Sequence, residues 1–363
     1  MNAPLLLWLG LGPAAAADLA LLGNSYSFFN DLDVQVRALL AEADPAAWAE
    51  GDTVRLADGG LRFVDHRQRI GQSGSAWATA FAPGATWDWV ILQEQSQIPG
   101  FPEGQADIEA SVVAAGELDD VAEAAGAQSV FLLTWGRRAG DADNEWLYPD
   151  FETMQGLLSA GYARYRDTTS TTDRPTWIAP AGPAFARVHA DERAAGVDPL
   201  ASTSRFSRLY TGDGSHPSPL GTYLAACVLV GTLTGQATVG LSPVGGVSAE
   251  DAAWLQAAAD ATVADATLGY TYPWQGGAGD GGSGGASDGA AGDGGGSDGA
   301  AGDDGGSDGA AGDDGAAADT GPGVPVGTPA KVSRDGGCAS APASPAAAGA
   351  LGALVVAARR RRR

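Results

Sequence analysis

"LALLGNSYSFFNDL", residues 19–32, changes its pattern at one point. An apolar run typical of a buried strand ends at Gly23-Asn24-Ser25, and the residues after it are spaced as in a helix that packs one apolar face. Ser25 therefore stands where a strand is followed by a helix. A serine at such a junction often only caps the helix. The free N–H groups of a helix start can also stabilise negative charge that develops beside a reactive hydroxyl. Both interpretations of Ser25 are open at this point.

The same order of strand and helix recurs along the chain. Apolar segments rich in β-forming residues precede helical patterns at four places: 19–23 before 27–43, 87–93 before 106–126, 129–135 before 150–167, and 176–182 before the C-terminal helices. This alternation predicts a three-layer α/β/α fold with a mainly parallel, flavodoxin-like sheet, whose sites lie at the carboxyl ends of the strands. Residues 52–66 fit the pattern less well, and "VRLADGGLRFVD" is interpreted as a hairpin that turns at Asp58-Gly59-Gly60.

The composition limits the folded part of the chain and its partners. From Gly276 onward the sequence consists mainly of Gly, Ala, Ser and Asp, which cannot bury a core, so we expect one folded domain over 18–275 and a disordered spacer over 276–334. The net charge of the chain is −23. Residues 1–275 hold 33 acidic and 14 basic residues and no lysine. Nucleic acid is therefore not an expected partner, because phosphate binding needs Lys and Arg.

Both ends of the chain carry patterns of export and sorting. Residues 1–17 have a short apolar core followed by small residues, which predicts a signal peptide cleaved near Ala17. Ten-residue repeats that begin at Ser287 form a flexible spacer. Residues 335–363 contain Cys338, an apolar stretch of roughly membrane-spanning length and the cluster Arg359–Arg363. The other cysteine, Cys227, lies in an apolar helical run and is expected to be a core residue.

This C-terminal layout resembles the MYXO-CTERM sorting tail of Myxococcales-type bacteria. The resemblance implies processing near Cys338, which would become the lipid-bearing end of the protein, with the body displayed at the surface or outer membrane of a Gram-negative cell. The membrane and the export and sorting machinery are then expected partners.

The search for a base that could activate Ser25 is short, because the chain has three histidines. His216 lies in "YTGDGSHPSPLG", just before a predicted helix, and Asp213 stands three residues earlier, where its carboxylate could orient the imidazole. The same Asp-x-x-His could be only a turn with a surface histidine. His66 and His189 lie among charged residues and are interpreted as solvent-exposed.

Taken together, these blocks resemble the SGNH, or GDSL-like, hydrolase superfamily over roughly residues 19–236. Gly23-Asn24-Ser25 matches the first block of that family, which implies that Ser25 is the nucleophile. Asp213 and His216 match the last block, which implies an orienting carboxylate and a general base.

The blocks that would form the oxyanion hole match less closely. The resemblance implies that the Ser25 N–H is joined by a glycine N–H, for which Gly74 is the match and Gly71 the alternative. The usual Asn of the third block is absent from "VILQEQSQIPG", which has a Leu-Gln-x-x-Ser pattern instead. Gln95 falls at the position of the Asn and could supply an amide donor, and Gln93 is the alternative.

The sequence therefore predicts an exported, surface-tethered serine esterase that needs no cofactor or metal. Short acyl esters, among them acetyl groups on polysaccharides, are the expected substrates. The alternative is a surface carbohydrate-binding or adhesion protein that keeps the fold with a weak or lost active site. Trp77, Trp135 and Trp146 could stack on sugar rings or belong to the core.

Overall fold

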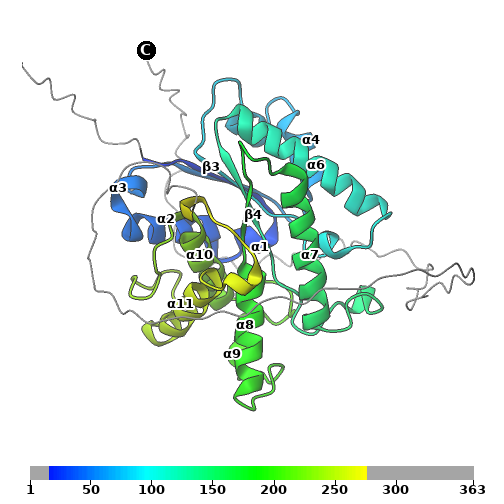
Figure 1. Cartoon of the computed structure of the whole chain (residues 1–363), viewed down its shortest axis with the longest axis vertical. Coiled ribbons are helices and arrows are strands. Elements are labelled where there is room, and N and C mark those ends of the chain that lie inside the picture. The colour runs from blue at the N-terminus through cyan, green and yellow to red at the C-terminus, as the bar shows by residue number, and fades with distance from the viewer. Residues whose placement is uncertain (1–15, 276–363) are drawn as a thin grey trace, which may run out of the picture. The chain divides into compact units, whose positions relative to one another are not determined.

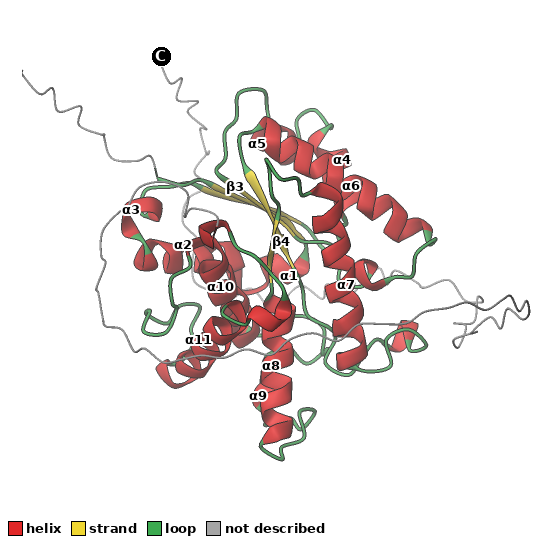
Figure 2. Cartoon of the chain, in the orientation of Figure 1, coloured by secondary structure: helices red, strands yellow, loops and turns green. Residues whose placement is uncertain are grey.

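The computed structural model describes residues 16–275, which fold around a five-stranded sheet with every strand parallel to its neighbours (Figures 1 and 2). The order of the strands across the sheet is β2-β1-β3-β4-β5, which is the order of flavodoxin-like folds. The strands are β1 (Leu19–Gly23), β2 (Thr53–Ala57), β3 (Trp89–Leu92), β4 (Gln128–Leu132) and β5 (Trp177–Ala179). The predicted α/β fold with a parallel sheet is confirmed.

Helices cover both faces of the sheet. Successive side chains of a strand point to opposite faces, so each strand contributes to two apolar cores. Leu19 and Leu21 of β1 pack into one apolar core and Ala20 and Leu22 into the other. The first core is covered by α2 (Leu32–Ala43), α8 (Ala181–Ala194), α10 (Pro219–Thr234) and α11 (Ala249–Val263). The second is covered by α4 (Phe63–Ile70), α6 (Ala106–Ala124) and α7 (Phe151–Thr169). The shorter helices are α1 (Ser25–Phe28), α3 (Pro45–Trp48), α5 (Ala76–Ala80) and α9 (Arg205–Arg208).

The predicted hairpin over residues 52–66 is wrong. β2 lies at the edge of the sheet and pairs in parallel with β1, with Leu19 opposite Thr53 and Gly23 opposite Ala57. The Asp58-Gly59-Gly60 turn leads into α4 instead of a returning strand, since the Asp65 carboxylate accepts the Arg62 N–H at 3.0 Å and fixes the start of that helix. The turn therefore lies at the carboxyl edge of the sheet, next to the end of β1.

The expected signal peptide, spacer and sorting tail fall almost wholly outside the described residues, and so does Cys338. Ala17 is described and is attached to the body: its N–H donates to the Ala47 carbonyl at 2.7 Å, and its carbonyl accepts from Arg37 at 3.0 Å. Cys227 is fully buried in α10, as expected of a core residue. Within residues 16–275, each helix is too short or too polar to cross a membrane.

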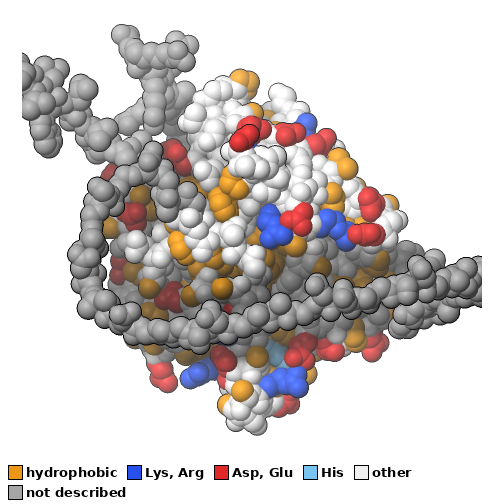
Figure 3. Space-filling model, viewed as in Figure 1, with side chains coloured by type: hydrophobic (Ala, Val, Ile, Leu, Met, Phe, Trp, Pro, Cys, Tyr) orange, Lys and Arg blue, Asp and Glu red, His pale blue; other side chains and the backbone are white. Residues whose placement is uncertain are grey.

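The acidic surface is partly neutralised by local ion pairs. Arg55 contacts Asp33, and Arg174 contacts the largely buried Asp119. On the face drawn in Figure 3, basic side chains lie beside acidic ones in the same way. Most arginines of residues 16–275 are thus engaged by carboxylates of the same chain.

Candidate active site

Ser25 is held in a tight turn between β1 and α1. Gly23 has no side chain there because a Cβ would lie 2.2 Å from Ser27 Oγ and 2.7 Å from Gln93 Oε1. The residue that caps α1 is Asn24, whose Oδ1 accepts the Tyr26 N–H at 3.1 Å. Ser25 is therefore the first helical residue and not the cap, so its hydroxyl is available for another partner.

That partner is His216. The distance from Ser25 Oγ to His216 Nε2 is 2.8 Å, and His216 Nδ1 lies 2.6 Å from Asp213 Oδ2. The structure thus brings the Ser25 hydroxyl to an imidazole that lies 191 positions further along the chain, and the carboxylate of Asp213 lies on the other side of that imidazole. This is the geometry of a serine nucleophile with its base and the carboxylate that orients the base.

The Asp213 carboxylate is fixed by its own turn. Its Oδ1 accepts the N–H groups of Ser215 at 2.8 Å and His216 at 3.0 Å, which leaves Oδ2 for the imidazole. Burial raises the pKa of Asp213. These hydrogen bonds and the one from the His216 ring together have the larger effect and lower the pKa to about 2. Asp213 is therefore an anion at neutral pH and holds the proton of His216 on Nδ1, so that Nε2 can accept the proton of Ser25.

The loop that carries His216 is closed on itself at both ends. The Thr211 N–H donates to the His216 carbonyl at 2.9 Å, and Tyr210 forms a β-bridge with Pro217. Gly214 has a φ of +70°, a conformation that favours glycine. Ser218 then caps α10, as its position before Pro219 predicts.

One backbone donor is available beside Ser25 Oγ. The Ser25 N–H has no acceptor within residues 16–275 and stands at the start of α1. A backbone N–H in this position can bind the negative oxygen of a tetrahedral intermediate formed on the neighbouring Oγ.

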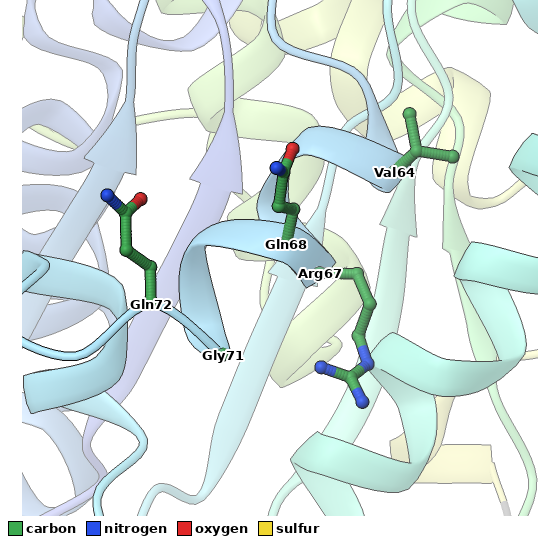
Figure 4. A pocket seen from close by; sticks show the side chains of 5 residues that line it. All are labelled: Val64, Arg67, Gln68, Gly71 and Gln72. Carbon is green, nitrogen blue, oxygen red and sulfur yellow. The ribbon is translucent and has the colours of Figure 1, made fainter.

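The structure does not place Gly74 beside Ser25. α4 begins at the carboxyl edge of the sheet and is eight residues long, about 12 Å, and Gly74 lies beyond its far end. Gly74 is exposed, with nothing in the described chain within 4 Å of the position that a Cβ would take. Gly71 donates its N–H to the Arg67 carbonyl and lines a surface hollow with Gln72 (Figure 4). Ser25, His216 and Asp213 together are called the relay. The hollow includes none of these three residues, and neither glycine contacts Ser25.

The loop 58–62, between β2 and α4, does contact the turn 23–25, which is called the nucleophile turn. The Asn24 side chain donates to the Leu61 carbonyl at 3.0 Å. Within this loop Gly60 has a φ of +65° and its N–H has no acceptor in the described chain. Sequence reasoning missed this loop because the Gly59-Gly60 pair was assigned to a hairpin, although a glycine pair directly after a strand was the available signal.

Gln95 and Gln93 are both buried, and both are engaged within the protein. Gln95 Oε1 accepts the N–H groups of Gln97 and Ile98, and its Nε2 donates to Gln97 Oε1 at 3.1 Å. Gln93 Oε1 accepts the Asn24 N–H at 2.9 Å. Neither amide makes a contact with Ser25, and Gln93 supports the nucleophile turn from behind.

His66 and His189 are buried, so the interpretation of both as solvent-exposed is wrong. His66 is 0% exposed, and its Nδ1 accepts from Trp77 Nε1 at 2.8 Å. Burial lowers its pKa to about 4, while the Gly23 carbonyl acts in the opposite direction. His189 packs between the rings of Phe151 and Phe206. The charged residues next to His66 and His189 in the sequence suggested exposure, but on a helix these neighbours lie on a different face from the histidine.

The three tryptophans considered as sugar platforms differ in exposure. Trp135 is fully buried, and its ring stacks between Tyr26 and Phe185. Trp77 is also buried, whereas Trp146 is 44% exposed. Of the three, Trp146 alone can reach a ligand from solvent.

The chain was also compared with known proteins. It matches no protein-family model and no curated protein. Among solved structures, a DUF4886 family protein from Bacteroides uniformis aligns at 17% identity over 68% of this chain and 95% of that one, with a TM-score of 0.51. This likeness shows that the two share a fold.

Two other solved structures match at lower TM-scores. A protein from Slackia heliotrinireducens described as an SGNH hydrolase is 29% identical over 59% of this chain and 97% of its own, with a TM-score of 0.43. An acetylxylan esterase from Geobacillus stearothermophilus is 14% identical over 62% of this chain and 95% of its own, with a TM-score of 0.40.

Proposed function

We propose that the chain is a serine esterase of the SGNH type. The observation that carries the proposal is the hydrogen-bonded series from Ser25 Oγ through His216 to Asp213, at the carboxyl edge of a parallel sheet. Each member has the partner and distance that its role requires.

In the proposed reaction, Ser25 Oγ forms a bond to the carbonyl carbon of an ester while His216 Nε2 takes the hydroxyl proton. The carbonyl oxygen becomes an oxyanion, for which the Ser25 N–H is one donor. His216 then gives its proton to the leaving oxygen, which departs as an alcohol and leaves an acyl-enzyme. A water molecule repeats the sequence, with His216 first as base and then as acid, and releases the carboxylic acid.

For the substrate we propose short acyl esters, acetyl groups on polysaccharides among them. The proposed location at the cell surface supports this class of substrate. A signal peptide and a sorting tail with Cys338 would display the domain there. The exposed Trp146 could contact a sugar ring.

The alternative, an adhesion protein with a lost active site, gives no reason for an assembled relay. The two proposals predict different behaviour of Ser25. In an esterase its hydroxyl is indispensable, whereas in a binding protein it could be replaced without loss of function.

The test uses purified full-length protein with an aryl acetate as substrate. Ser25→Ala should lower kcat by about 10⁴-fold or more, because the members of a triad act as a unit. A fluorophosphonate should label the wild type and not the variant. Ser248→Ala, which removes a serine that caps α11, is the matched control and should keep full activity. Equal rates for wild type and Ser25→Ala would overturn the proposal.

A further inference from the structure

The segment after α1 has an unusual backbone. Asn30 has a φ of 53° and Asp31 a φ of 54°, and they are the only residues other than glycine with positive φ within residues 16–275. Two consecutive residues in this conformation carry strain, which persists where surrounding contacts determine it, commonly at functional sites. The pair lies between α1, which carries Ser25, and α2.

The contacts of Asn30 explain what holds the turn. Its Nδ2 donates to the Pro217 carbonyl at 3.0 Å and to Thr222 Oγ1 at 2.9 Å, and its own carbonyl accepts from Gln35 at 2.7 Å. Pro217 directly follows His216. Asn30 therefore connects the segment of the nucleophile to the loop of the base.

A second connection lies on the other side of the relay. The Tyr26 hydroxyl is 2.8 Å from Ser215 Oγ, and Trp135 Nε1 donates to the Ser215 carbonyl at 3.2 Å. Three consecutive residues of the loop, 215–217, thus each bond a residue of segment 25–30: Ser215 to Tyr26, His216 to Ser25 and Pro217 to Asn30. The relay bond is the middle one of the three.

The turn also places an aromatic ring on the base. Phe29 stacks on the imidazole of His216, with 4.4 Å between ring centroids and 16° between planes. The ring of Tyr26 packs against the same imidazole in a T-shaped arrangement, with 5.7 Å between ring centroids. The ring of His216 is therefore confined by two aromatic rings of the segment that follows Ser25.

We propose that Asn30 is a positioning residue of the esterase site: its carboxamide and the left-handed turn hold the His216 loop at the distance at which Nε2 can take the Ser25 proton. This inference rests on the proposed function. Proton transfer needs a separation of about 2.6–3.2 Å, and a displacement of about 1 Å can cost about 100-fold in rate. Asn30 acts through the loop and does not touch the reacting atoms.

The first test is Asn30→Gly, because glycine keeps the left-handed conformation and removes the carboxamide. We expect kcat for an aryl acetate to fall by about 10- to 100-fold, with KM changed less than about threefold, since the substrate is not contacted. Labelling by a fluorophosphonate should slow in parallel. Asp31→Gly is the matched control: its side chain is exposed and bonds Arg55, away from the His216 loop, so kcat should stay within about twofold.

Asn30→Asp decides the case if Asn30→Gly does not fold. Aspartate has nearly the same size but cannot donate to the Pro217 carbonyl, so kcat should fall as in Asn30→Gly. A kcat equal to that of the wild type in a folded Asn30 variant, or a change in thermal stability or KM alone, would overturn the inference. Failure of the proposed function would look different: the wild type itself would neither turn over the acetate nor be labelled at Ser25.

Discussion

The two sides of the nucleophile turn are built from different kinds of contact. On the relay side, Asp213 and His216 interact through side chains, and the Asp213 side chain is 50% exposed. On the support side, Gln93 and Glu94 are fully buried and bind the backbone: Gln93 holds the Asn24 N–H, and the Glu94 carboxylate holds the Phe63 N–H at 3.0 Å.

The difference separates proton movement from support. A relay needs groups that can change protonation near solvent, whereas a support needs groups whose bonds persist. Glu94 shows what burial of a supporting group costs. Burial raises its pKa to about 7, although donors such as Ser111 and the Gln95 N–H act to lower it. Changes on the relay side should therefore alter turnover, and changes on the support side should alter stability.

The largest effect is expected on the relay side, from Asp213→Asn. The amide oxygen can still accept the N–H groups of Ser215 and His216, so the turn should persist. The amide nitrogen would then face His216 Nδ1 as a donor and move the imidazole proton to Nε2, where it blocks transfer from Ser25. We expect kcat to fall by about 10³- to 10⁴-fold, measured with an aryl acetate.

The free energy of unfolding of Asp213→Asn should change by less than about 1 kcal/mol, because the carboxylate is half exposed. Asp198→Asn, at an exposed turn, provides a control with the same chemical change and should keep wild-type turnover. A variant that loses stability and activity together would remove the distinction between the two sides.

The support side also includes His66, which is buried near the Gly23 carbonyl and should make the stability of the protein depend on pH. Its pKa is depressed to about 4 by burial, while an ordinary histidine in the unfolded chain titrates near 6.5. The stabilisation from the neutral ring is therefore complete above pH 6.5 and is lost as the pH falls toward 4. The free energy of unfolding should decrease by about 3 kcal/mol over this interval through this group, as measured by denaturant titration at a series of pH values.

His66→Gln isolates this contribution. The glutamine oxygen can accept from Trp77 as Nδ1 does, but the side chain does not titrate. The pH dependence of the variant should be shallower than that of the wild type by about the same 3 kcal/mol. Parallel curves for the two proteins would show that His66 is not a supporting group of the kind described.

The sequence predicted the relay side better than the support side, and the reason is physical. Ser25, Asp213 and His216 stand at changes of pattern, a strand end and a helix start, and parallel strands bring such points to one edge. His66 and Gln93 stand inside segments whose polarity in sequence hides their burial. A buried polar residue needs a hydrogen-bond partner, here Trp77 for His66 and Asn24 for Gln93. Such pairs form only when separate elements pack together.

The donors of the proposed oxyanion hole were predictable only in part for the same reason. The Ser25 N–H follows from the local turn, since any residue at the start of a helix has a free N–H. Gly74 was chosen by matching a pattern along the chain, and the length of α4 carries it away from the edge. The loop 58–62 accepts a hydrogen bond from the Asn24 side chain, and the glycine pair directly after β2 was the only local signal for this loop.

The smallest effect on activity is expected from Gln95, which the sequence assigned to the oxyanion hole and whose amide is hydrogen-bonded to Gln97 and Ile98 of its own loop. Gln95→Glu keeps an oxygen for the Gln97 and Ile98 N–H groups but removes the amide donor. If the amide serves only its own loop, kcat should fall less than about threefold, whereas loss of an oxyanion donor costs about 10²- to 10³-fold.

Gln95→Ala completes the comparison, because it removes the acceptor as well. It should lower the free energy of unfolding by about 1–3 kcal/mol, since two buried N–H groups lose their partner, and again leave kcat nearly unchanged. A loss of about 100-fold or more in both variants, at normal stability, would move Gln95 to the reactive side. The oxyanion would then be held by a side chain that must leave its bond to Gln97 when substrate binds.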